Sequence, residues 1–100
     1  MVSVPLTADE AFNEKMRELA RLDEQTSEEK IYSLFDLGGC LCRIRNAITL
    51  IGKARESGDP LILTGIEKMV HYARTHDAPH IQFPFIYLGF FESDRSLKRP

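Results

Sequence analysis

The side chains best suited to metal or acid–base chemistry are three histidines, His71, His76 and His80. Their spacings of five and four residues straddle the expected end of a helix, and they differ from the zinc-binding i, i+4 pair that accompanies a glutamate base. Neither cysteine of the chain lies near them. The pattern predicts surface or helix-end histidines, with no metal site and no cofactor.

The two cysteines, Cys40 and Cys42, are two residues apart. On a helix such positions point about 200° away from each other, so the thiols cannot share a metal ion or a disulfide there. The adjacent Gly38-Gly39 pair lies in an apolar helical pattern and lacks the lysine and serine of a phosphate-binding loop. With no nucleophile motif either, the sequence predicts a protein that is not an enzyme.

Composition predicts one folded domain over residues 1–100. Hydrophobic residues make up 43% and charged residues 28% of the 100 residues, which is ordinary for a globular chain. A net charge of −2 argues against a general attraction to nucleic acid or to an anionic membrane. No apolar run reaches membrane-spanning length, and we expect a cytoplasmic protein with flexible ends at 1–6 and 93–100.

The sequence pattern predicts that helices position any functional site. Thr7 and Glu10 form a capping-box pattern, which predicts a first helix over about 8–22 with Phe12, Met16 and Leu19 on its apolar face. Gly58, Asp59 and Pro60 fit a helix C-cap, an N-cap and a first helical position. They predict a third helix over about 60–76, folded back on the second as an antiparallel hairpin.

A second helix is predicted over about 27–56, with Thr26 and Glu29 as its capping box. Steps of three and four residues connect the apolar positions of its central seam, Leu34, Leu37, Leu41, Ile44, Ile48 and Ile51. Gly38-Gly39 leaves a break in the helix as an alternative. Because the seam stays in phase across the glycines, we favour one continuous helix.

The segment from Ile81 to Phe91 is aromatic and uncharged. Pro84 argues against a central strand and against a helix interior, so we expect an extended segment, with a short helical turn from Phe85 onward as an alternative. The fold class is therefore all-α: a small bundle of three main helices with an extended or short-helical aromatic C-terminal segment.

The apolar surface exceeds what a single hairpin of helices needs, which predicts contact with another chain. For a homodimer interface we expect the broad apolar face of the second helix, Leu41, Ile44, Ala47, Ile48, Leu50 and Ile51. For a partner protein we expect the aromatic segment, namely Ile81, Phe83, Phe85, Tyr87, Leu88, Phe90 and Phe91. The alternative is that the aromatic residues close the protein's own core. Gly38 and Gly52 are candidates for close approach of another helix.

Charge leaves two further interpretations open. Residues 1–30 contain eight acidic and four basic residues, which is either a solvated helix face or an acidic surface that meets a basic partner. Arg43, Arg45, Lys53 and Arg55 form a run with no acidic residue between them, but on a helix they point in separate directions and make no stripe that could follow phosphates. A helical DNA-binding transcription regulator is therefore kept only as the alternative function. The function we expect is a small regulatory protein that binds a partner protein, such as a transcription regulator, and masks its apolar surface.

Overall fold

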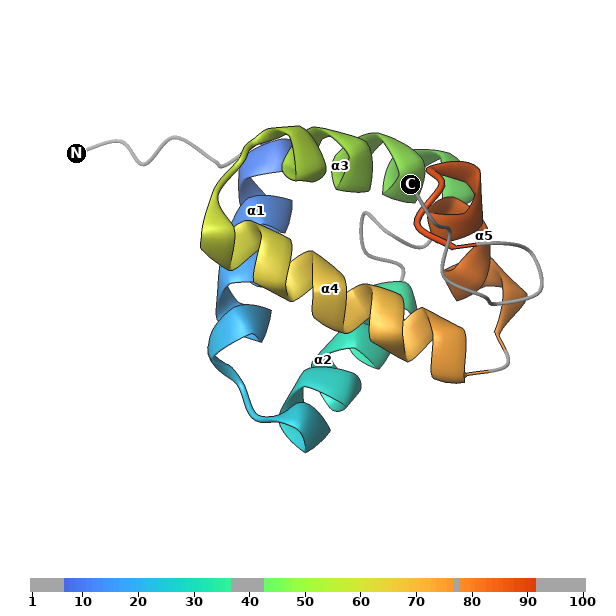
Figure 1. The fold of residues 1–100 in the computed structure, drawn as a ribbon, viewed down its shortest axis with the longest axis horizontal. Helices are drawn as coiled ribbons and strands as arrows, with labels where there is room; N and C mark the ends of the chain where they lie inside the picture. Colours follow the sequence, from blue (N-terminus) through green and yellow to red (C-terminus); the bar gives the residue numbers. More distant parts are fainter. Residues whose placement is uncertain (1–6, 37–42, 77, 92–100) are drawn as a thin grey trace.

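The computed structural model describes residues 7–36, 43–76 and 78–91, and these form five α-helices. The helices are α1 (Ala8–Arg21), α2 (Glu24–Asp36), α3 (Ile44–Glu56), α4 (Pro60–Thr75) and α5 (Pro79–Tyr87). In Figure 1, α3 runs along the top and α2 lies at the bottom, with α4 between them and α5 beside the start of α3. The all-α prediction is confirmed, whereas the ends predicted to be flexible fall outside the described residues.

The capping box that begins α1 is present. The backbone N–H of Glu10 donates to Thr7 Oγ1 (3.2 Å), and the backbone N–H of Thr7 donates to the Glu10 carboxylate (3.4 Å). The two bonds satisfy donors that have no partner inside the first turn of a helix. The apolar face behind this cap is buried at Phe12, Met16 and Leu19, as predicted.

The turn between α3 and α4 also follows the prediction. Gly58 has a φ of 74°, a left-handed conformation that glycine adopts without a steric penalty. Asp59 Oδ1 accepts from the backbone N–H of Leu61 (2.9 Å), and Pro60 occupies the first helical position of α4. The short turn folds α4 back beneath α3.

The prediction of one helix over 27–56 is wrong. Asp23 provides the N-cap by accepting from the backbone N–H of Thr26 (2.9 Å), so the second helix begins at Glu24. Arg43 is extended, with φ −105° and ψ 132°, and a separate helix begins at Ile44. The two glycines themselves lie outside the described residues.

Packing explains why two helices replace one. The buried residues of α2, including Ile31 and Phe35, belong to an element that packs on α4. In contrast, α3 buries Ala47, Leu50 and Ile51 in an element that packs on α1, α4 and α5. A straight helix cannot place both sets against the same core, so tertiary burial outweighs the continuity of the seam.

The aromatic segment is helical from Pro79, six residues earlier than the turn expected from Phe85, and Pro84 lies inside that helix. Proline removes the bond to the carbonyl group of the residue four positions earlier, His80. Ile81, Pro84 and Phe85 are buried together on one face of this helix. The burial of this face offsets the cost of an interior proline.

One core collects apolar side chains from all five helices and from Phe91. In the part of the chain that the structure describes, every buried side-chain nitrogen and oxygen has a hydrogen-bond partner. Among the described helices, none is long and apolar enough to cross a membrane.

Candidate functional site

The seven aromatic-segment residues predicted to bind a partner divide into two groups. Ile81, Phe85 and Phe91 are buried in the core of their own chain, and Leu88 and Phe90 are packed against that core. Phe83 and Tyr87 are different, since 54% and 69% of their surfaces are exposed. Of the seven residues, only these two have more than half of their surface exposed to solvent.

The six residues predicted to form a dimer interface also divide. Ala47, Leu50 and Ile51 are buried in the core, and Leu41 lies outside the described residues. Ile44 remains exposed (39%), and Ile48 is half-buried beside it. The exposed apolar face of α3 is therefore narrower than the broad apolar face expected from the sequence.

The exposed members of both sets come together in space. Ile44, Ile48 and Tyr87 line one hollow of about 310 Å³, with Arg45 and Thr49 at its side. Phe83 lies one turn before Tyr87 on α5, and residues four apart share a helix face. We call Ile44, Ile48, Phe83 and Tyr87 the α3–α5 surface.

Two cations of α3 are engaged within the chain. Lys53 Nζ pairs with Asp9 (3.0 Å). The Arg55 guanidinium donates to the carbonyl oxygen of Leu88 (2.9 Å) and lies 4.9 Å from the ring centre of Phe90. Arg55 thus fastens the turn after α5 onto α3 by a hydrogen bond and a cation–π contact.

A second hollow lies between α2 and α4, with a volume of about 390 Å³. The residues that line it repeat at helical spacing on both sides, so each helix contributes one face. From α2 they are Glu24, Ser27, Glu28 and Ile31, and from α4 they are Thr64, Glu67, Lys68, His71 and Tyr72. An adjoining hollow of about 420 Å³ shares Glu28 and Tyr72 and adds Glu29, Tyr32 and His76. We call the two together the α2–α4 groove.

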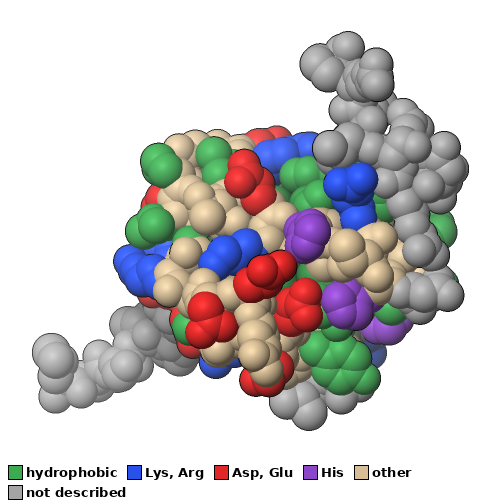
Figure 2. Space-filling model, turned by 60° about the horizontal axis from the view of Figure 1, so that its bottom comes forward, with side chains coloured by type: hydrophobic (Ala, Val, Ile, Leu, Met, Phe, Trp, Pro, Cys, Tyr) green, Lys and Arg blue, Asp and Glu red, His purple; other side chains and the backbone are tan. Residues whose placement is uncertain are grey.

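Carboxylates surround this groove. Glu24, Glu29 and Glu67 are exposed at its edges and Glu28 is half-buried. Figure 2 shows acidic side chains gathered on this face of the molecule, with histidines next to them. Across residues 7–36, 43–76 and 78–91, none of the four carboxylates forms an ion pair.

The one lysine of the groove is committed to the fold. Lys68 Nζ donates to the carbonyl oxygens of Leu22 (2.6 Å) and Leu19 (2.7 Å) at the end of α1, and it lies 3.4 Å from the hydroxyl of Ser27. A cation at a helix C-terminus satisfies carbonyl groups that lack a helical partner and meets the negative end of the helix dipole. Lys68 therefore holds the α1–α2 turn against α4, and its charge is not directed at the carboxylates.

Aromatic rings form the apolar part of the groove. Tyr72 is buried, its ring stacks on His76 with centres 3.7 Å apart, and Tyr32 is 54% exposed. Burial raises the pKa of Tyr72, and Tyr32 and the carboxylate of Glu28 add smaller contributions in the same direction. The phenol therefore stays neutral in neutral solution and acts as an apolar wall with a polar tip.

The three histidines do not meet. His71 lines the groove, His76 stacks on Tyr72, and His80 makes an edge contact with Phe35 at 6.2 Å between ring centres. Within the described ranges, no three histidine, cysteine, aspartate or glutamate side chains are placed to hold a metal ion.

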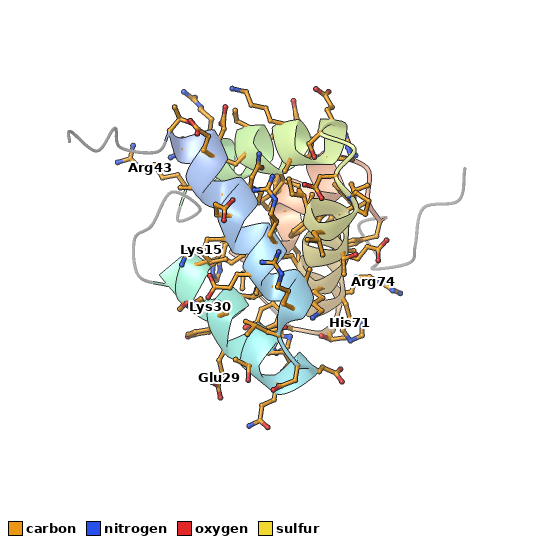
Figure 3. All side chains as sticks on the ribbon, turned by 90° about the vertical axis from the view of Figure 1, so that its left-hand side faces the viewer. Lys15, Glu29, Lys30, Arg43, His71 and Arg74 are labelled. Carbon is orange, nitrogen blue, oxygen red and sulfur yellow. The ribbon has the colours of Figure 1, made fainter. Side chains whose placement is uncertain are left out.

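A salt bridge joins α1 to α2. Glu18 accepts from Lys30 (3.1 Å) and from Lys15 (3.5 Å), and Figure 3 shows both lysines at the α1–α2 side. The hydrogen bond from Lys30 lowers the pKa of Glu18. In the same view, Glu29 and His71 project from α2 and α4 into solvent. Five of the eight acidic residues in the opening third are thus engaged inside the fold, while Glu24, Glu28 and Glu29 line the groove.

The sequence pattern missed several residues that shape these surfaces. Two of them lie on α4: Tyr72, which is buried, and Lys68, whose ammonium group binds the end of α1. Gly65 was also overlooked, although a Cβ at this position would lie 2.7 Å from the carbonyl carbon of Met16. For Lys68 the available signal is its place among apolar neighbours on α4, since a long side chain can cross apolar surface and still reach a polar target.

Comparison with protein-family models, curated proteins and solved structures finds no match to this chain, so the surfaces described above are the basis for assigning a function.

Proposed function

We propose that the chain is a small, non-catalytic regulatory protein of the cytoplasm that binds another protein and masks an apolar surface on it. The observation that carries the proposal is the α3–α5 surface. Large apolar side chains from two helices, Ile44, Phe83 and Tyr87, are exposed next to a hollow of about 310 Å³.

The grouping of these side chains matters more than their exposure. Single exposed apolar residues are common in soluble proteins, whereas adjacent ones beside a hollow are typical of interaction sites. Tyrosine and other aromatic residues are enriched at the centres of protein interfaces, because they bury a large area with little loss of side-chain freedom. Phe83 and Tyr87 meet this description.

The partner is a protein with an apolar recess or helix face of similar size. The dimerisation surface of a transcription regulator is the target that we propose, because covering it would prevent the regulator from pairing. A second copy of the chain is the alternative occupant, since a two-fold dimer brings one patch against itself.

DNA binding is not proposed as a second function. Two of the four basic residues that motivated it, Lys53 and Arg55, contact Asp9 and the turn after α5. The exposed face of α3 also includes Ile44 and is continuous with Tyr87.

The test compares partner capture by the wild-type protein with capture by Phe83→Asp and Tyr87→Asp. Leu61→Asp is the matched control, because Leu61 is an exposed apolar residue at the start of α4, away from the α3–α5 surface. We expect both surface variants to stay folded by circular dichroism and to lose the captured protein, while the control retains it. Equal capture by all four proteins would refute the assignment of the site.

Light scattering over a range of protein concentrations tests the second occupant. A dimer of the wild type that becomes a monomer in Tyr87→Asp would identify the α3–α5 surface as a self-association site. A wild type that stays monomeric would leave the partner protein as the proposed occupant.

A further inference from the structure

We infer that the α2–α4 groove is a second docking site, and that its occupant is a short basic amphipathic helix of a partner protein. The inference does not depend on the α3–α5 surface. In Figure 1, α3 and α2 lie on opposite sides of α4, so the two sites face different directions. A chain with both sites would connect two partners.

The dimensions of the groove suit a helix of two to three turns. Its lining runs from Glu24 to Tyr32 on α2 and from Thr64 to His76 on α4. At 1.5 Å per residue these stretches are about 12 and 18 Å long. The two helices cross in Figure 1, so these stretches flank the groove from two sides, and an amphipathic helix can lay its apolar face into such a groove.

The interior of the groove is apolar. Ile31 and Tyr72, which are almost fully buried, form the floor of the groove, and the ring of Tyr32 supplies the exposed apolar surface that a ligand can reach. Lys68 adds its aliphatic stem, because its ammonium group is bound to the end of α1. Leucine-sized or larger side chains on one face of the ligand would fill this interior.

The edges of the groove determine the charge of the occupant. Glu24, Glu28 and Glu29 stand on α2, and Glu67 faces them from α4. These four carboxylates form no ion pair among the described residues, while Glu14, Glu18, Asp9 and Asp59 are each paired inside the fold. Lysine or arginine residues that flank the apolar face of the ligand would complement both edges at once.

The probe for a binding test is a fluorescein-labelled peptide of leucine and lysine, about 14 residues long, with leucines at i, i+3, i+4 and i+7 spacing. Fluorescence anisotropy measures its Kd for the full-length protein. A peptide with glutamate in place of lysine serves as the charge control. We expect the lysine peptide to bind and the glutamate peptide to bind at least about tenfold more weakly.

A matched pair of triple variants separates the groove from general charge attraction. Glu24→Gln, Glu28→Gln and Glu67→Gln neutralise its edges, and Glu10→Gln, Glu14→Gln and Glu56→Gln make the same change of net charge at exposed sites elsewhere. We expect about a tenfold rise in Kd for the groove variant and less than a threefold rise for the control. Equal rises would overturn the inference, since they would show attraction to net charge alone.

A second pair of variants distinguishes peptide binding at the α2–α4 groove from peptide binding at the α3–α5 surface. Tyr32→Ser removes an exposed ring from the groove, and Phe83→Ser removes an exposed ring from the α3–α5 surface. We expect only Tyr32→Ser to weaken the peptide, by about fivefold. A larger loss with Phe83→Ser would place the peptide on the other surface and overturn the inference, as would no binding of the lysine peptide at about 1 mM protein. Thermal melts confirm that each variant is folded.

Discussion

Adding a single methyl group at Gly65 should lower the free energy of unfolding substantially. Alanine is favoured over glycine in a helix interior by about 1 kcal/mol, so the substitution Gly65→Ala would stabilise α4 if the helix stood alone. In the structure, however, the added Cβ would lie 2.7 Å from the carbonyl carbon of Met16 and 2.8 Å from its Cα, and closer still to the carbonyl oxygen. These are backbone atoms of α1 and cannot rotate away.

The expected magnitude follows from the two opposing effects. Forcing extra volume into a well-packed core costs about 1 to 3 kcal/mol, and the upper end applies here because two whole helices must move apart. Subtracting the gain of about 1 kcal/mol in helix propensity leaves a net loss of about 2 kcal/mol in the free energy of unfolding. For a domain of this size, that corresponds to a fall in Tm of about 10 °C.

Gly52→Ala is the control. Gly52 is also inside a helix, but a Cβ there would meet only the Cδ2 atom of Leu88 at 3.7 Å, an ordinary van der Waals distance. Its helix-propensity gain should therefore appear as a rise in stability of up to about 1 kcal/mol. Urea unfolding followed by circular dichroism measures both variants. A Gly65→Ala protein as stable as the wild type, or more stable, would refute the close contact between α1 and α4.

Three further predictions concern the core, the α1 cap and acid stability. Phe85→Ala should lower the free energy of unfolding by about 3 to 5 kcal/mol, because Phe85 is fully buried. Phe83→Ala, at an exposed position two residues earlier, should lower it by less than about 1 kcal/mol. Similar urea midpoints for the two variants would contradict the burial of Phe85 and the exposure of Phe83. Lys68→Met should lower the free energy of unfolding by about 1.5 to 3 kcal/mol, because carbonyl groups at the end of α1 lose their charged donor. Lys53→Met removes an exposed ion pair and should change the free energy of unfolding by less than about 1 kcal/mol. Equal losses in urea unfolding would show that Lys68 does not cap the C-terminus of α1. The backbone N–H of Leu61 lowers the pKa of Asp59 below its usual 3.8. As the pH falls, the unfolded chain therefore takes up this proton before the folded chain does. The carboxylate contributes its full stabilisation above the pKa of the unfolded chain and loses it as the pH falls through the pKa of the folded chain. Asp59→Asn keeps a capping oxygen but removes this titration, so its stability deficit, measured by urea unfolding, should shrink as the pH falls from about 5 to about 2; a constant deficit would show that the carboxylate does not titrate in this way.

Local sequence patterns predicted the parts of the fold that depend on neighbours in the chain. The Thr7 capping box, the Gly58-Asp59-Pro60 turn and the buried face of α1 all appear in the structure, since each involves residues within a few positions of one another. Such contacts are specified by hydrogen-bond geometry and helical spacing alone.

Predictions failed where a local preference competed with burial. The in-phase apolar seam favoured one long helix, but Arg43 is extended because α2 and α3 pack on different parts of the core. Pro84 argued against a helix, yet α5 includes it because the face formed with Ile81 and Phe85 is buried. At Pro84 the area removed from water outweighs a helix-propensity cost of about 3 kcal/mol.

The candidate sites show the same division. Composition and spacing alone indicated an acidic N-terminal third, an aromatic C-terminal segment and the absence of a recognisable catalytic motif. Only the tertiary structure decided which of those residues meet solvent together: Phe83 and Tyr87 beside Ile44 on one side, and Glu24, Glu28 and Glu67 around a groove on another. The physical reason is that exposure and grouping depend on how helices distant in the sequence cross, and the contact that sets the α1–α4 crossing, Gly65 against the backbone of Met16, lies between residues 49 positions apart.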